Sequence, residues 1–287
     1  SLYLEKVIEK KLKITKKEDP IYILKSIKNN IEVKNMIKAH VMDGVALTKF
    51  IYWIKNLKKL NITEFDAQNK LEKIRRTNSK YLFPSFNTIA GSGKNAAIVH
   101  YRATKNNTKL LKKNEIFLCD SGGQYKFGTT DVTRTICFEN QNNNIKNIFT
   151  NVLKGHIAVA QTDLNKKKTG KLIDKDARKF LKKDRLDYNH GTGHGVGFFL
   201  NVHEGPQAIS KSNSIKIQKG MILSNEPGYY KKDKFGIRIE NLIYVKKIGR
   251  KLVFENLTLA PIEKELINFN LLTKQEKSYL FNYHLKV

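Results

Sequence analysis

The chain has 287 residues, of which 40% are hydrophobic and 10% aromatic, a composition that excludes a disordered protein and fits one large or two small domains. The formal net charge is +28, but lysines are scattered over nearly every segment and arginine is sparse, so we expect a solvated surface and no specific nucleic-acid partner. No apolar run approaches the roughly 20 residues that cross a bilayer, and no signal peptide is recognisable, so we expect a cytoplasmic protein without membrane association.

The first predicted elements are a basic segment and two helices. Residues 1–22 are rich in lysine and broken by Pro20, so we expect a connector or an edge strand and treat residues 1–25 as a connector or the remnant of an upstream domain. The first helix is predicted over residues 33–57 by apolar positions at three-to-four spacing, namely Val33, Ile37, Val41, Val45, Thr48 and Ile51. For the second helix, Thr63, followed by Asp66 three residues later, predicts a capped start, and the helix runs to about Arg75.

Strands and further helices follow. The stretches "EIFLCD" (115–120) and "DVTRTICF" (131–138) predict two strands joined by a glycine-rich hairpin connection. They contain the only cysteines, Cys119 and Cys137, which we expect to be buried thiols of a protein from a reducing compartment. Helical patterns cover about 144–162, 171–182 and 273–283, and "GMILSNEPGYY", "FGIRIENLIYV" and "KLVFENLTLAP" predict strands. This arrangement predicts an α+β fold.

Two pairs of carboxylates occupy matching places in the two halves of the chain. Asp120 and Asp131 lie at the end of one predicted strand and the start of the next, and Glu226 and Glu240 do the same. This echo suggests a pseudo-twofold core with four carboxylates at its centre. Such crowding is prohibitive unless cations neutralise it. Two divalent ions about 3.5–4 Å apart would neutralise the four carboxylates. We expect Mn²⁺ as the preferred metal, with Co²⁺, Zn²⁺ or Fe²⁺ as substitutes.

The stretch "YNHGTGHGVGFFLNVHEGP" (188–206) gathers three of the seven histidines. His190 and His194 have the spacing of a metal-binding helix, but the alternating glycines make a helix untenable there. The histidines must therefore be judged singly, and His190 is equally compatible with a structural role and a substrate role. The remaining histidines outside recognisable motifs are expected to be surface or packing residues, namely His40, His156 and His284.

Several ordered motifs, taken together, resemble one known family. The stretches "FPSFNTIAGSGKNAAIVHY", "LCDSGGQYKFGTTDVTRT", "YNHGTGHGVGFFLNVHEGP", "SNEPGYY" and "FGIRIEN" resemble, in order and spacing, the catalytic domain of the aminopeptidase P (Xaa-Pro aminopeptidase) branch of the pita-bread metallopeptidases. The resemblance implies that residues 26–287 form a pita-bread catalytic domain, with a pseudo-twofold antiparallel sheet core flanked by helices. Further domains usually precede this one in the family, and this chain has no room for them.

The resemblance also implies roles for individual residues. Two metal ions, bridged by Asp131 and Glu240, would generate a hydroxide between them, with Glu226 transferring its proton. His100 and His203 would contact the substrate and stabilise the tetrahedral intermediate. Candidates for lining the proline pocket are Phe83, Tyr229 and Arg238, although Arg238 is also compatible with neutralising the carboxylates. His190 is a candidate substrate contact. The implied metal ligands are Asp120, Asp131, His194, Glu226 and Glu240.

The expected activity is removal of the first residue from peptides with proline at the second position, by a homodimer. A prolidase or a methionine aminopeptidase of the same fold is the first alternative. A non-catalytic pita-bread binding module is the second, and the presence of all five ligand residues argues against it.

Overall fold

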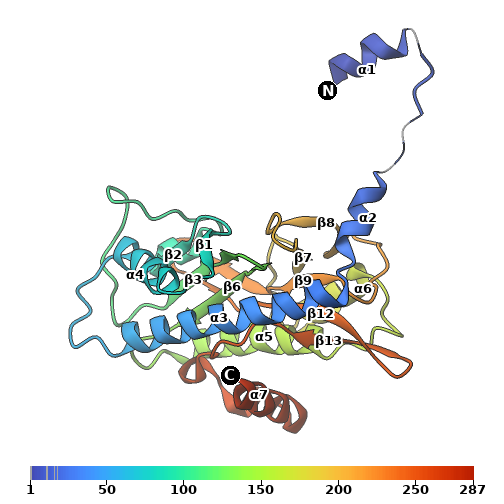
Figure 1. Cartoon of the computed structure of the whole chain (residues 1–287). Helices are drawn as coiled ribbons and strands as arrows, with labels where there is room; N and C mark the ends of the chain where they lie inside the picture. Colours follow the sequence, from blue (N-terminus) through green and yellow to red (C-terminus); the bar gives the residue numbers. More distant parts are fainter. Residues whose placement is uncertain (1, 11, 16, 18) are drawn as a thin grey trace.

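The computed structural model describes residues 2–10, 12–15, 17 and 19–287 (Figure 1). The helices are α1 Leu2–Glu9, α2 Pro20–Ser26, α3 Asn30–Lys55, α4 Glu64–Arg76, α5 Asn143–Ala160, α6 Gly170–Lys183 and α7 Lys274–Lys286. The strands are β1 Tyr81–Pro84, β2 Ile89–Ser92, β3 Phe117–Ser121, β4 Gly123–Tyr125, β5 Gly128–Thr129, β6 Val132–Ile136, β7 Gly193–Gly195, β8 Glu204–Ile209, β9 Ile222–Asn225, β10 Gly228–Lys231, β11 Phe235–Arg238, β12 Asn241–Ile248 and β13 Lys251–Asn256.

The strands form antiparallel sheets. A five-stranded sheet has the order β13-β12-β9-β7-β8, and a three-stranded sheet has the order β2-β3-β6. The strands β1, β4 and β5 form a third sheet, and β10 pairs with β11. The five-stranded sheet and the β2-β3-β6 sheet meet where the amide of Glu240 donates to the carbonyl of Thr133 over 3.1 Å. The expected α+β fold is therefore confirmed.

The predicted correspondence between the two halves is visible in the strand pairing. Strand β3 pairs with β6, with Asp120 opposite Thr133, and β9 pairs with β12, with Asn225 opposite Asn241. The two long strands predicted for the second half are each interrupted, one after Asn225 and the other after Arg238. Pro227 contributes to the first break because it has no amide to donate to a sheet. The breaks leave Glu226 and Glu240 at the ends of strands.

Helices cover the sheets and build the core. Residues of α3 and α4 pack against β3 and β6, while α5 packs against β11 and the C-terminal helix α7. Figure 1 shows α3 and α5 running alongside the central strands. Thr63 and Asp66 form the predicted capping box at the start of α4, and Thr273 caps α7 in the same way.

The predicted apolar stripe of α3 is on the wrong side of the helix. Ile37, Val41 and Val45 are 40%, 45% and 51% exposed. The buried face instead includes His40 and Asp43, with Met36, Leu47 and Phe50 among its apolar members. Because this buried face includes polar residues, the apolar periodicity of the sequence does not reveal it. They are tolerated in the interior because each is hydrogen-bonded, His40 to the carbonyl of Met36 and Asp43 to Arg75.

The edge strand considered for residues 1–22 is also wrong, because the described part of this segment contains helices. Asp19 caps α2 by accepting a hydrogen bond from the amide of Ile21, and Pro20 occupies the first helical turn, where its missing amide costs nothing. Figure 1 shows α1 standing apart from the other elements. Lys28, just after α2, forms a buried ion pair of 2.5 Å with Glu204 at the start of β8. The boundary at residue 25 stays a prediction.

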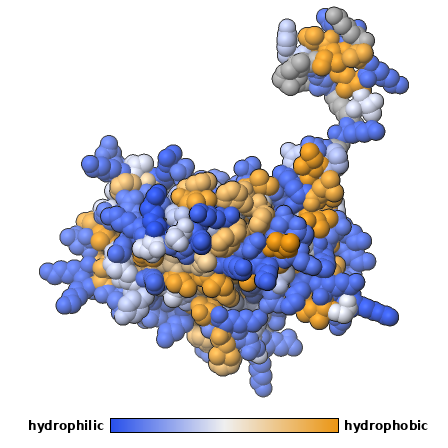
Figure 2. Space-filling view, in the orientation of Figure 1, coloured by the Kyte–Doolittle hydropathy of each residue, from blue (hydrophilic) through white to orange (hydrophobic). Residues whose placement is uncertain are grey.

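Figure 2 shows hydrophilic residues spread over the visible face, with hydrophobic patches among them, rather than concentrated in one groove. In the described part of the chain, no helix combines the length and the apolar character that crossing a bilayer requires.

Candidate active site

Five side chains from both halves of the fold converge at the ends of strands. Asp120 lies in β3 and Asp131 directly precedes β6, whereas His194 is the central residue of β7. Glu226 directly follows β9, and Glu240 lies between β11 and β12. All five line one cavity of about 310 Å³. The convergence predicted from the sequence is therefore present in the structure.

The distances are those of groups that share a cation. The Nε2 atom of His194 lies 3.5 Å from Oδ2 of Asp131 and 3.4 Å from Oε1 of Glu226. Asp131, His194 and Glu240 each offer one possible ligand atom, and these three atoms lie within 4.8 Å of one another. Oxygen-rich ligation with one imidazole nitrogen suits a divalent ion such as Mn²⁺.

The electrostatics show why the site needs positive charge. Burial, and the neighbouring Asp120 and Glu226, raise the pKa of Asp131 well above its ordinary value. Burial, and then Asp131 and Glu226, raise the pKa of Glu240 in the same way. Carboxylates crowded in a poorly hydrated site hold protons unless cations replace them. The donor set therefore fits a pair of divalent ions.

Hydrogen bonds from neighbouring strands fix the carboxylates. Thr133 donates to Oε2 of Glu240 over 2.7 Å, and Ser224 donates to Oε1 of Glu226 over 3.0 Å. Arg238 donates to Oδ2 of Asp120 over 2.6 Å. The other oxygen, Oδ1 of Asp120, is buried and has no hydrogen-bond partner among the described residues. A buried carboxylate oxygen without a donor is an expected feature of a metal ligand.

The backbone of β7 brings His194 to the site. An added Cβ at Gly193 would lie 1.9 Å from the carbonyl oxygen of Ser224, so only glycine allows β7 to pack this closely on β9. The amide of His194 donates to Oγ of Ser224 over 2.9 Å, and its Nδ1 lies 2.9 Å from the carbonyl oxygen of Gly195. A protonated Nδ1 bonded to that carbonyl leaves Nε2 free as a ligand.

Three further histidines line the same cavity, namely His100, His190 and His203. The rings of His194 and His203 are 4.3 Å apart at nearly a right angle. Burial, and then the adjacent His194, lower the pKa of His203. Burial also lowers the pKa of His190. Neutral imidazoles at this cavity can accept or donate hydrogen bonds to a bound peptide.

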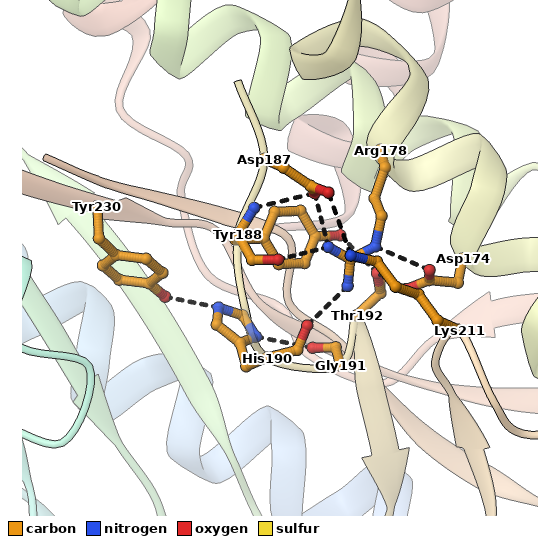
Figure 3. Close-up of polar contacts among 9 residues, drawn as sticks. All are labelled: Asp174, Arg178, Asp187, Tyr188, His190, Gly191, Thr192, Lys211 and Tyr230. Carbon is orange, nitrogen blue, oxygen red and sulfur yellow. Dashed lines mark hydrogen bonds and ion pairs between the residues drawn. The ribbon is translucent and has the colours of Figure 1, made fainter. Parts of the chain in front are cut away.

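A buried arginine on α6 holds the histidine loop in place (Figure 3). Arg178 donates to Asp174 over 2.8 Å and to the carbonyl oxygens of Tyr188 and His190 over 2.6 Å each. The other oxygen of Asp174 accepts a hydrogen bond from Thr192 over 2.6 Å. The carbonyl of Thr192 in turn accepts the amide of Glu226 over 2.8 Å. This network is not evident from the sequence, because an acid and an arginine four residues apart on a helix ordinarily indicate a solvated face.

Two residues proposed for the proline pocket lie elsewhere. Phe83 lines a neighbouring cavity, and Tyr229 packs against Phe235. Tyr230, the next residue, contacts two residues that line the carboxylate cavity: its hydroxyl accepts a hydrogen bond from Arg238 over 2.6 Å and lies 2.9 Å from Nε2 of His190. Alternation along a strand could not have found it, because the strand is interrupted between Glu226 and Tyr230. The apolar residues that line the cavity are Phe86, Ile89 and Val99.

The two cysteines and the three histidines for which no chemical role is expected occupy packing positions. Burial raises the pKa of both Cys119 and Cys137 to about 12, so neither is an activated thiol. His40 and His156 are buried, and Nε2 of His284 accepts a backbone hydrogen bond from Ile262. These positions confirm the packing roles expected of them.

A second acidic cluster, formed by Cys137, Glu263 and Glu265, differs from the five-residue site. Lys55 lies 2.5 Å from Glu263 and 3.6 Å from Glu265, and it supplies the positive charge that this cluster requires.

Comparisons with known proteins agree with the site. The model of metallopeptidase family M24 matches residues 34–247, and the model of the C-terminal region of peptidase M24 matches residues 250–287. A relative named probable Xaa-Pro aminopeptidase P, from Laccaria bicolor, is 45% identical over 280 residues, which cover 92% of this chain and 43% of the relative.

Solved structures give the same result. The X-prolyl aminopeptidase of Caenorhabditis elegans, described as a cytosolic enzyme with a di-nuclear active site, has a TM-score of 0.87 and 36% identity, covering 93% of this chain and 45% of that one. The prolidase of Pyrococcus furiosus has a TM-score of 0.77 and 27% identity, covering 91% of this chain and 73% of that one. These matches confirm the expected pita-bread fold. The chain spans less than half of the Laccaria and Caenorhabditis proteins.

Proposed function

Because the chain belongs to metallopeptidase family M24, we propose that it carries the catalytic machinery of an Xaa-Pro aminopeptidase, which removes the first residue from peptides with proline at the second position. The Laccaria bicolor and Caenorhabditis elegans relatives support this choice of substrate, since both are named for it. The proposed function depends mainly on one observation, that all five ligand residues line the same cavity.

The metal ligands of the proposal are Asp120, Asp131, His194, Glu226 and Glu240. When bound, two divalent ions would polarise the scissile carbonyl and acidify a water molecule. Oxygen-rich ligation favours Mn²⁺, with Co²⁺, Zn²⁺ and Fe²⁺ as substitutes. Burial of the carboxylates excludes competing water, so that each ionic interaction there is stronger than it would be in solvent.

Glu226 is the residue best placed to move a proton. Its side chain is 18% exposed, compared with 5% for Asp131, and it therefore has access to water within the cavity. Ser224 donates to its Oε1, which leaves Oε2 to accept a proton from the attacking water and pass it to the leaving nitrogen.

His100 and His203 are proposed to hold the substrate. Both line the cavity beside the carboxylates, where an imidazole N–H can donate a hydrogen bond to a peptide carbonyl and to the oxyanion that develops from it. Proline makes the scissile bond a tertiary amide without an N–H, so a site that recognises it needs shape and apolar contact. Phe86, Ile89 and Val99 supply apolar surface in the cavity.

His190 and Arg238 line the same cavity, and Tyr230 links them in a hydrogen-bonded row. We propose that the row closes the proline pocket, with Arg238 also neutralising Asp120.

The choice of scissile bond separates this function from its alternatives. The Mn²⁺-loaded chain is incubated with Xaa-Pro dipeptides, Xaa-Pro-Yaa tripeptides and Met-Ala peptides, and the products are identified by chromatography. We expect release of Xaa from the tripeptides. Cleavage of the dipeptides alone would show a prolidase, and cleavage of Met-Ala would show a methionine aminopeptidase. Absence of both bound metal and cleavage would show a binding module.

Two further expectations stay proposals. A cytosolic location is supported by the description of the Caenorhabditis enzyme and by two buried, unpaired cysteines. Homodimer formation is tested by sedimentation velocity, with a mass near 66 kDa expected from a chain of 33.1 kDa.

A further inference from the structure

Beside the carboxylate cavity lies a second concave surface with an apolar rim. It has a volume of about 630 Å³, and the two cavities share His203. Three large apolar side chains line it and are exposed to solvent: Phe83 is 53% exposed, Phe199 45% and Leu200 51%. Single exposed apolar residues are ordinary, but several around one concavity indicate a binding surface.

The loop that presents Phe199 and Leu200 is firmly held. The carbonyl oxygen of Leu200 accepts hydrogen bonds from Gln124 over 2.8 Å and from Thr129 over 3.3 Å. The amide of Gly197 donates to the carbonyl of Asn201 over 3.0 Å. A rigid loop can bind a ligand without first losing conformational entropy.

Phe199 also has a strained backbone. Its φ angle is +51°, in the left-handed region that large residues rarely adopt. Strain of this kind persists only where the surroundings enforce it, and it concentrates at functional sites. Here it turns the side chain of Phe199 outward, whereas the preceding Phe198 packs against the core.

The size of the carboxylate cavity indicates what the second surface binds. At about 310 Å³, the first cavity is at the lower end of small-molecule sites, which span about 300–1,000 Å³. It has room for the two residues that flank the scissile bond. An aminopeptidase substrate has one residue before that bond but any number after it, so the remainder of the peptide must leave past the cavity wall.

We propose that Phe83, Phe199 and Leu200 form a subsite for an apolar side chain of the peptide residue that follows proline, with His203 marking the boundary between the two cavities. This inference rests on the proposed function. It names the peptide class that the site selects: Xaa-Pro-Yaa in which Yaa is aromatic or large and aliphatic.

Matched tripeptides test the subsite. Initial rates are measured for Ala-Pro-Phe, Ala-Pro-Leu and Ala-Pro-Gly with the Mn²⁺-loaded 287-residue chain, and kcat/KM ratios are compared. We expect Phe and Leu to be preferred over Gly by about tenfold, because partial burial of one such side chain is worth about that factor. In Phe199→Ala, and more strongly in the double variant Phe199→Ala, Leu200→Ala, the ratio falls towards one. Alanine retains a Cβ, so the backbone strain at residue 199 is unchanged.

A control variant and a binding measurement complete the test. Phe281→Ala removes another exposed phenylalanine, which lies on α7 and is 65% exposed compared with 45% for Phe199, and should leave the ratio unchanged. Calorimetry of the dipeptides Pro-Phe and Pro-Gly, which are the expected products, should give the same preference without turnover.

Four outcomes would overturn the subsite. If the wild-type chain cleaves all three peptides equally well, or if Phe199→Ala keeps the full preference, the subsite is wrong while the proposed function stands. If the double variant changes the oligomeric state and not the peptide preference, the surface belongs to a contact between copies of the chain. Failure to cleave any Xaa-Pro peptide would overturn the proposed function and the subsite together.

Discussion

Replacing Arg178 should damage catalysis through the position of the histidine loop. Its guanidinium contacts the carboxylate of Asp174 and the carbonyls of Tyr188 and His190 at 2.6–2.8 Å, and its side chain is only 2% exposed. In Arg178→Met the carboxylate of Asp174 loses its buried cationic partner. Breaking a buried pair in this way costs about 3–5 kcal/mol. We expect the free energy of unfolding to fall by about that amount.

The conservative variant separates stability from positioning. In Arg178→Lys the charge beside Asp174 is retained, but a single ammonium group cannot reproduce the planar fork that reaches both carbonyls. Leaving buried carbonyls without donors costs about 1–3 kcal/mol. A displacement of about 1 Å at a substrate-contacting group can lower the rate by about 10²-fold. We therefore expect Arg178→Lys to lower kcat/KM on an Xaa-Pro tripeptide by about one to two orders of magnitude.

Urea unfolding and steady-state kinetics on the same preparations provide the assay. The matched control is Lys154→Met, which breaks a buried pair of 2.8 Å with Glu276, between α5 and α7. It should lose comparable stability and keep its kcat/KM in the folded state. The reasoning is refuted if Arg178→Lys is destabilised but retains the wild-type kcat/KM, because Arg178 would then be merely structural.

Three further predictions concern stability and metal binding. Burial lowers the pKa of His156 to about 3 from an ordinary 6.5, so the unfolded chain binds the extra proton below pH 6.5. Stability is therefore lost as the pH falls from 6.5 towards 4, and in urea titrations His156→Gln should reduce this slope by about 1.4 kcal/mol per pH unit. Gly193→Ala places a Cβ 1.9 Å from the carbonyl of Ser224 and should weaken Mn²⁺ binding, measured by calorimetry, by about 10-fold or more; unchanged affinity would show that β7 can shift freely. Lys28→Met leaves Glu204 buried without its 2.5 Å partner and should lower the free energy of unfolding by about 3 kcal/mol, whereas a loss below 1 kcal/mol would show that the pair is dispensable.

The sequence predicted those parts of the site that depend on residue type and order. Four carboxylates at the ends of paired strands have few explanations other than cations, so their convergence followed from the chemistry. The position of Glu226 relative to Ser224, and of Asp131 relative to Thr133, follows from strand alternation and could have been predicted too. The buried Cys119 was likewise evident from its apolar strand.

Other features depend on tertiary contacts that a periodic pattern does not reveal. The buried face of α3 contains Asp43, which is acceptable only because Arg75 and Tyr125 lie beside it. Arg178 has the sequence context of a solvated helix, and only the loop folded over it makes it buried. Tyr229 and Tyr230 are adjacent in sequence, and the pairing of β10 with β11 decides which one meets Arg238.

Metal stoichiometry tests the central claim most directly, namely that Asp131, Glu240 and their three partner ligands hold a pair of divalent ions. The chain is purified without chelators, dialysed against Mn²⁺, and its metal content is measured by mass spectrometry beside titration calorimetry. We predict two ions per chain, no more than one in Asp131→Asn, and two in the control Glu263→Gln, whose carboxylate belongs to the cluster already neutralised by Lys55. A wild-type chain that binds no divalent ion, or whose stoichiometry is unchanged in Asp131→Asn, would contradict the account.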